Sequence, residues 1–233
     1  MKKIIGYFLS TCASVLIVFV LTQGLLGYQR YREVSLLKPL DLVAASIEKQ
    51  PNYVELDEVS KDFIHAILAV EDPNFYEHPG IEMSKIIEAF ITDIVHMDYV
   101  MGGSTISQQL CKNLFLDQNK EISRKVAELF FVYDIEQQWS KDKILELYLN
   151  VIYFGDGYYG IHDASQGYFG KKPSELTLDE ATLLAGLPQA PAVYQLSDGY
   201  DLALKRQVIV LEAMVESNYL TPFEMNQVVE GRG

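Results

Sequence analysis

The sequence predicts a mainly helical body preceded by one transmembrane helix. Three observations carry this prediction. Residues 4–27 form an uncharged apolar run, apolar positions recur with a helical period through the rest of the chain, and no sustained two-residue alternation occurs. About 205 residues follow the apolar run, which is enough for one hydrophobic core with a small additional lobe.

The composition indicates a globular body with an acidic surface. Apolar residues make up 49% of the chain, charged residues make up 22%, and the formal net charge is −13. This balance argues against a nucleic-acid-binding protein, because phosphate binding requires a basic surface. Cys12 lies in the apolar run and Cys111 in the body, so the body cannot form an internal disulfide. The number of cysteines therefore does not determine whether the body lies in an oxidising or a reducing compartment.

The apolar run is long enough to cross a bilayer, with 24 uncharged residues against the roughly 20 required. Lys2 and Lys3 precede it and predict a cytoplasmic N-terminus with the body outside, although Arg30 and Arg32 after it weaken that orientation. A cleaved signal peptide is the alternative, but its apolar region usually has about 7 to 15 residues. We therefore expect an uncleaved anchor.

Helices in the body are predicted where a capping residue precedes a helical period, while residues 36–57, with two prolines, are expected to be irregular or mixed. Gly- and Tyr-rich "YFGDGYYG" is expected to form a loop. The predicted helices are 60–70, 81–96, Ser104 or Thr105 to 116, 123–139, 140–150, 177 to the proline at 188, and 201–217.

The helix predicted at 60–70 is followed by two adjacent carboxylates, Glu71 and Asp72. A carboxylate at this end faces the negative end of the helix dipole, which is mildly unfavourable. In an apolar pocket its pKa would rise, which suits a general base. A solvated helix end is the simpler alternative.

Two further stretches carry polar groups in patterns that fit phosphate or sugar binding. In "GGSTISQQLCKN" the glycines permit close ligand approach, and helix-start amides with two hydroxyls form a potential anion site, although an ordinary capped helix explains the pattern equally well. In "RKVAE", Arg124, Lys125 and Glu128 have the spacing of a surface ion pair, which is the favoured interpretation, and a cleft position for Glu128 is the alternative. The four histidines show no metal-ligand spacing.

Taken together, these stretches resemble the peptidoglycan glycosyltransferases, which form the transglycosylase module of class A penicillin-binding proteins and the monofunctional transglycosylases. Five family motifs occur in order: E-D-x-x-F-x-x-H-x-G at Glu71 to Gly80, G-G-S-T-I-[ST]-Q-Q at Gly102 to Gln109, R-K-x-x-E at Arg124 to Glu128, "SKDKILELYLN" at 140–150, and "KRQVIVL" at 205–211. Departures are Ala127 in place of a lysine, Lys205 in place of an arginine, and Gln195-Leu196 in place of Asn-Pro.

The resemblance implies a lysozyme-like larger lobe plus a smaller membrane-facing lobe, and residues 81–96 either belong to the smaller lobe or pack in the core. No transpeptidase S-x-x-K motif occurs in a usable context, so a monofunctional enzyme or the first domain of a bifunctional one is expected. The implied organisation is a cytoplasmic tail at 1–3, an anchor at 4–27 in the bacterial cytoplasmic membrane, a linker at 28–52, an extracytoplasmic glycosyltransferase domain at 53–217, and a tail at 218–233.

The resemblance implies an inverting enzyme that polymerises lipid II into glycan strands and releases undecaprenyl pyrophosphate. Glu71 would be the general base toward the acceptor 4-hydroxyl, and Glu128 would position the donor or a divalent cation, Mg²⁺ or Mn²⁺. No organic cofactor and no nucleic acid are expected, and partners would be lipid II, the growing strand, the bilayer and other wall-synthesis proteins. The implied substrate-binding residues are Asp72, Phe75, His78, Ser104, Thr105, Gln108, Gln109, Lys112, Asn113, Lys120, Arg124 and Lys125.

Two other functions remain open at this point. A lysozyme-like peptidoglycan hydrolase would also use two carboxylates, whereas the basic residues and the Gly-Gly-Ser-Thr motif favour transfer. An inactive membrane-anchored scaffold of wall synthesis is the non-enzymatic alternative, and the presence of both glutamates argues against it. The resemblance also predicts that moenomycin binds the donor site.

Overall fold

The computed structural model describes residues 2–82, 103–117 and 121–231. Within these ranges the regular structure is helical apart from one isolated antiparallel bridge between Tyr153 and Tyr159. The prediction of a mainly helical body behind a long apolar helix is confirmed. The helix predicted at residues 81–96 lies outside the described residues from position 83 onward.

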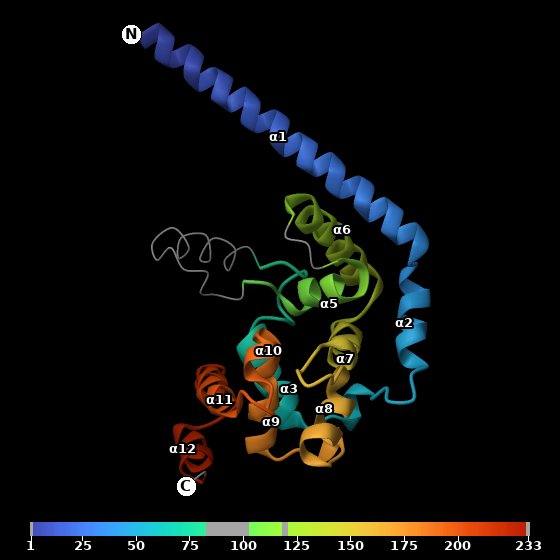
Figure 1. Cartoon of the computed structure of the whole chain (residues 1–233), viewed down its shortest axis with the longest axis vertical. Helices are drawn as coiled ribbons and strands as arrows, with labels where there is room; N and C mark the ends of the chain where they lie inside the picture. The colour runs from blue at the N-terminus through green and yellow to red at the C-terminus, as the bar shows by residue number, and fades with distance from the viewer. Residues whose placement is uncertain (1, 83–102, 118–120, 232–233) are drawn as a thin grey trace.

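Helix α1 (Lys2–Leu37) is longer than the predicted anchor, because it continues through residues 28–37 without a break. It extends away from the body at the end where α5 and α6 lie (Figure 1). The segment Leu9–Leu37 is long and apolar enough to cross a membrane, and its most apolar stretch is wholly exposed in the structure. This exposure fits a membrane anchor or a signal segment, and it does not fit a core helix.

The end of α1 packs against α6 (Ile122–Gln138). Arg30 Nη2 lies 2.5 Å from Asp117 Oδ2 and Arg30 Nη1 lies 3.1 Å from Glu121 Oε2. The Tyr31 hydroxyl donates to Asp134 Oδ2 at 2.5 Å. The apolar helix is therefore joined to the body through side-chain contacts as well as through the chain.

Residues 36–57 are more regular than predicted, because the prolines flank a helix and do not interrupt it. Pro39 is the N-cap of α2 (Leu40–Glu48), where a missing N–H costs nothing. Ala44 and Ile47 of α2 are buried against the core. A short 3₁₀ turn, η1 (Leu56–Glu58), follows.

The core is built around α3 (Lys61–Glu71), whose Phe63, Ala66 and Ile67 have no exposed surface. Helices α9 (Leu178–Ala185) and α11 (Tyr200–Glu216) pack against it, and α5 (Ile106–Phe115) packs against α6 and α7 (Lys141–Val151). Ser60 precedes α3 as predicted, but its hydroxyl donates to the Leu176 carbonyl at 3.2 Å and does not cap the helix.

Besides α2, three more helices were not predicted from the sequence. Helix α8 (Gly160–Phe169) begins at a glycine with φ of +78° and contains a second glycine, so its signal is weak. Helix α12 (Pro222–Glu230) begins with a capping box between Thr221 and Glu224, which is a readable signal. The third is α10 (Pro191–Tyr194), and the 3₁₀ turns η2 (Pro173–Glu175) and η3 (Leu187–Gln189) complete the fold.

Candidate active site

Glu71 is the last residue of α3, and its carboxylate is held by a helix that is distant in sequence. Gln109 of α5 donates from Nε2 to Glu71 Oε2 at 2.7 Å. The Tyr148 hydroxyl of α7 donates to Gln109 Oε1 at 3.1 Å. Tyr148 is wholly buried, so it fixes which end of the Gln109 amide faces Glu71.

Asp72, the neighbouring carboxylate, is completely buried, and its hydrogen bonds hold the local structure together. It accepts hydrogen bonds from His78 Nε2, at 2.9 Å and 3.0 Å to its two oxygens, and from the Ile106 backbone N–H at 3.0 Å. The Gly80 N–H donates to His78 Nδ1 at 3.0 Å, so the proton of a neutral ring sits on Nε2. These bonds fasten the turn after α3 to the start of α5.

The start of α5 is satisfied by groups of the chain itself. Thr105 Oγ1 accepts from the Gln108 N–H at 3.2 Å, and Gln108 Oε1 accepts from the Thr105 N–H at 3.1 Å. The Thr105 hydroxyl donates to the Gly80 carbonyl at 2.6 Å. With Ile106 bound to Asp72, the amides expected to bind a phosphate are occupied internally, and Thr105 and Gln108 are 1% and 2% exposed.

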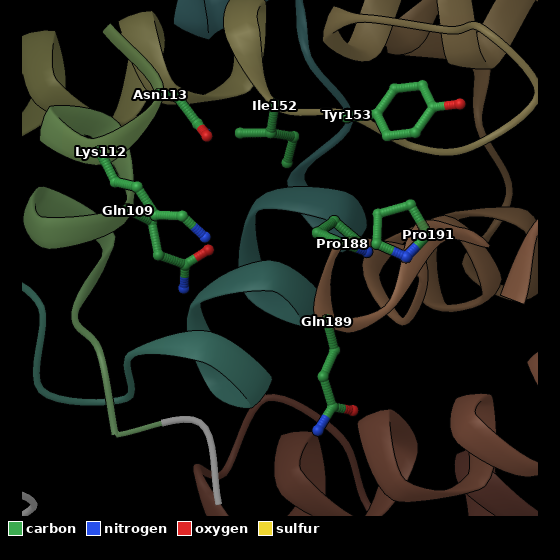
Figure 2. A pocket seen from close by; sticks show the side chains of 8 residues that line it. All are labelled: Gln109, Lys112, Asn113, Ile152, Tyr153, Pro188, Gln189 and Pro191. Carbon is green, nitrogen blue, oxygen red and sulfur yellow. The ribbon is translucent and has the colours of Figure 1, made fainter. Parts of the chain in front are cut away.

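A cavity of about 300 Å³ lies next to Gln109. Figure 2 shows Gln109, Lys112 and Asn113 of α5 on one side of it, with Tyr153 and the prolines of the 187–191 segment on the other. The structure thus brings together three predicted site residues. It adds Ile152, Tyr153, Pro188, Gln189 and Pro191, which the sequence analysis did not single out.

The third motif places a buried carboxylate, Glu128, between two cations that are more exposed, so the favoured interpretation as a surface pair is wrong for Glu128. Glu128 is 2% exposed. Arg124 Nη1 lies 3.0 Å from Glu128 Oε2, and Lys125 Nζ donates to Oε1. Burial, followed by the charge of Glu128, raises the pKa of the Cys111 thiol, which indicates that Glu128 lies near α5. These α6 residues are not part of the cavity lining around Gln109.

Three other predicted residues complete the set, namely Phe75, Ser104 and Lys120. Phe75 is fully buried, and Lys141 Nζ lies 4.5 Å from the centre of its ring. This cation–π contact stabilises the turn that follows Glu71. Ser104 is half-buried just before α5. Lys120 lies outside the described residues.

The predicted metal ligand Glu128 does not fit a resident cation, because each of its oxygens already contacts a basic side chain. Among the described residues, ligand atoms of Asp72, His78 and Glu82 lie within 4.8 Å of one another. Both His78 ring nitrogens are engaged in hydrogen bonds, so no ring lone pair faces a metal. We therefore assign this group to hydrogen bonding.

The chain matches a known protein family and members of that family. Residues 40–215 match the protein family described as Transglycosylase. Penicillin-binding protein 1A of Aquifex aeolicus is 46% identical over 177 residues, which cover 76% of this chain and 24% of that protein. A provisionally named transglycosylase of Cupriavidus necator is 38% identical over 180 residues, which cover 77% of each chain.

Among solved structures, penicillin-binding protein 1A from Haemophilus influenzae matches with a TM-score of 0.45 and 25% identity, over 76% of this chain and 17% of that one. The chain spans about a quarter of the length of the Aquifex aeolicus penicillin-binding protein that it matches, 24%.

Proposed function

Because the chain belongs to the transglycosylase family, we propose that it is a peptidoglycan glycosyltransferase that polymerises lipid II. The acceptor 4-hydroxyl oxygen attacks the anomeric carbon of the donor strand, and the bond from that carbon to undecaprenyl pyrophosphate breaks with inversion. The observation that carries the proposal is the fixed carboxylate of Glu71, which Gln109 holds beside a cavity that also receives Lys112.

Glu71 is the general base of the proposed reaction. It takes the proton from the acceptor hydroxyl as the new bond forms, which requires a carboxylate in a fixed direction. The hydrogen bonds from Tyr148 to Gln109 and from Gln109 to Glu71 supply that direction. Asp72, Phe75, His78, Thr105 and Gln108 support this arrangement from the protein interior.

The leaving pyrophosphate requires neutralisation of charge and no protonation. Lys112 provides a positive charge inside the cavity, and Asn113 lines the cavity beside it. Arg124 and Lys125 on α6 extend the basic set, and Glu128 holds both in position. In this proposal the buried residues of the predicted set support the site, and the more exposed residues contact the substrate.

The anchor fits a lipid-linked substrate. Helix α1 would place the body at the bilayer surface, where lipid II resides, with the catalytic domain outside the bacterial cytoplasmic membrane. The proposed domain spans residues 53–217. Other wall-synthesis proteins would be its partners in the cell.

The decisive test replaces Glu71→Gln, which keeps the shape and removes the base. Polymerisation of labelled lipid II is expected to fall by about 10²- to 10⁴-fold, whereas moenomycin binding and the melting temperature are retained. Glu77→Gln, a change at an exposed glutamate in the same turn, is the matched control and should keep full activity.

Full polymerisation by Glu71→Gln would contradict the assignment of the base. Release of fragments from finished wall by the wild-type protein, with no polymer formed, would support the hydrolase. A folded wild-type protein that does neither would support the scaffold.

A further inference from the structure

A second cavity lies beside the Gly- and Tyr-rich loop at residues 153–160. It has a volume of about 550 Å³ and is open to solvent. Its lining is largely aromatic and comprises Tyr158, Tyr168, Phe169 and Tyr200. We call this cavity the aromatic groove. Asp156 and Ser197 add polar groups to it, and none of the described residues that line it is basic.

The aromatic side chains of the groove are held in place by contacts within the chain. Tyr158 and Tyr168 meet edge to face, with ring centres 4.8 Å apart and ring planes at 79°. The Tyr168 hydroxyl donates to Asp156 Oδ2 at 3.0 Å. Gly167 of α8 makes room for the Tyr158 ring, because a Cβ there would overlap that ring. Since the rings are already fixed, a ligand would lose little free energy in ordering them.

The composition of the aromatic groove fits a neutral sugar. Tyr200, the first residue of α11, is 51% exposed, so its ring is accessible to a ligand. The face of an aromatic ring carries partial negative charge and attracts the C–H bonds on one face of a sugar ring. Polar groups such as those of Asp156 and Ser197 bind hydroxyls at sites of this kind. A phosphate or another anion is disfavoured, because Asp156 is acidic and no described lining residue is basic.

The aromatic groove and the proposed active-site cavity are built by the same two segments. The loop contributes Tyr153 to the cavity and Tyr158 to the groove, and the segment before α11 contributes Pro191 and Ser197 in the same way (Figure 2). Tyr153 and Tyr158 are five residues apart, so their Cα atoms are at most about 18 Å apart. One glycan strand a few sugars long can therefore span the two sites.

The two segments are also fastened to each other. The Ser197 N–H donates to Asp156 Oδ2 at 3.1 Å, and the Asp156 N–H donates to Gln195 Oε1 at 3.3 Å. Gly155, with φ of +89°, packs on the same segment, because a Cβ there would come within 2.6 Å of Gln195 Cβ. The aromatic groove thus has a fixed position relative to the cavity beside Gln109.

We propose that the aromatic groove binds the glycan strand made at the proposed active site and retains it between successive additions. The ligand is a chain of amino sugars, and the rings of the groove pack against it away from the reacting atoms. This inference rests on the proposed function, because that reaction makes the strand. Its consequence is that the groove determines the length of the strands and not the rate of bond formation.

The experiment polymerises labelled lipid II with the full chain and with Tyr200→Ala. It measures the initial rate of lipid II consumption and the mean length of the strands. Loss of the aromatic surface weakens retention of the strand, so we expect strands about threefold shorter at an unchanged initial rate. Thermal melting checks the fold of the variant, and Tyr200→Leu replaces it if alanine is not tolerated.

Two control variants separate the ring from other effects. Tyr200→Phe keeps the ring and should keep the wild-type strand length. Tyr133→Ala removes a tyrosine of α6 that is 64% exposed and does not line the groove, and it should change neither quantity.

A binding measurement tests the aromatic groove without any reaction. A tetrasaccharide of β-1,4-linked N-acetylglucosamine is titrated into the full chain in detergent. We expect Tyr200→Ala to bind it about threefold more weakly than the wild type or Tyr133→Ala does.

The possible results are distinct. Equal strand lengths for the wild type and Tyr200→Ala would overturn the inference and leave the proposed function intact. A lower initial rate with unchanged strand length would also overturn it, because that pattern indicates support of the active site. Absence of polymer from the wild type would overturn the proposed function, and this inference with it.

Discussion

Glu71 and Asp72 are neighbours in sequence with opposite environments. The side chain of Asp72 is enclosed and binds His78 and the start of α5, whereas Glu71 meets the amide of Gln109 beside a cavity. The buried acid holds the turn in place, and the turn determines where the other acid points. In the proposed mechanism, chemistry and support are thus divided between two adjacent carboxylates.

Tyr148→Phe tests the support of the base without touching the substrate. The change removes the hydroxyl that donates to Gln109 Oε1, leaving a buried acceptor unsatisfied and the Gln109 amide free to turn. We expect kcat to fall about fivefold and stability to fall by about 1 kcal/mol. Tyr133→Phe, at a tyrosine that is 64% exposed, is the control and should change neither. Unchanged kcat in Tyr148→Phe would show that the Gln109 amide is held toward Glu71 without the Tyr148 hydroxyl.

The sequence identifies the residue types of the site but not the direction of each side chain. Gln108 and Gln109 are adjacent in one motif, yet Gln108 is buried in the capping box and Gln109 faces Glu71. Which of them turns inward depends on how α5 packs against α6 and α7, and a single helix does not carry that information. For the same reason the sequence does not identify the far wall of the cavity, which comes from Tyr153 and from the later segment at 187–191.

At the scale of elements, α6 joins the anchor to the candidate basic cluster. One side of α6 holds Tyr28 and Tyr31 of α1 against Phe130, with ring centres 5.3 Å apart in both pairs. The same helix carries Glu128 with its two basic partners. If α1 is the proposed membrane anchor, its packing against α6 also sets the position of that cluster relative to the bilayer.

Gly27 in α1 provides a test of this contact. A Cβ at Gly27 would lie 2.5 Å from Val126 Cβ, so Gly27→Ala should separate the helices and destabilise the body by about 1 to 3 kcal/mol. Gly24→Ala is the matched control, because a Cβ there meets nothing within 4 Å and alanine favours a helix. Thermal unfolding in detergent measures both. Equal melting temperatures for the two variants would contradict a close α1–α6 contact.

Local signals predicted helices well where a cap and a period coincide. Thr105, Ser140 and Thr177 each cap a helix as expected, because their hydroxyls accept from the backbone N–H three residues later. The prediction was wrong for α2, because Pro39 was interpreted as a helix breaker although it precedes the first residue of the helix. Local signals also give no reason for α1 to continue past its apolar part, because packing against α6 stabilises that extension.

At the scale of the whole molecule, an acidic net charge coexists with local basic groups. The chain carries a net charge of −13, yet Lys112 lies in the cavity, and Arg124 and Lys125 are paired on α6. Local basic groups suffice for one pyrophosphate, whereas a nucleic acid would require a basic surface. Helix α1 leaves the body at the α5 and α6 end, so the two helices that carry these cations lie at the end of the body from which α1 departs (Figure 1).

The proposed orientation across the membrane predicts which cysteines a membrane-impermeant maleimide reaches in intact bacteria. In a Cys12→Ser background Cys111 stays silent, because it has no exposed surface and burial raises the pKa of its thiol. Gln137→Cys, at an exposed position of α6, should then be labelled in intact cells. Lys3→Cys, before the apolar run, should be labelled only after the membrane is opened. The reverse pattern would place the body in the cytoplasm, away from an extracytoplasmic wall, and would contradict the proposed site of polymerisation.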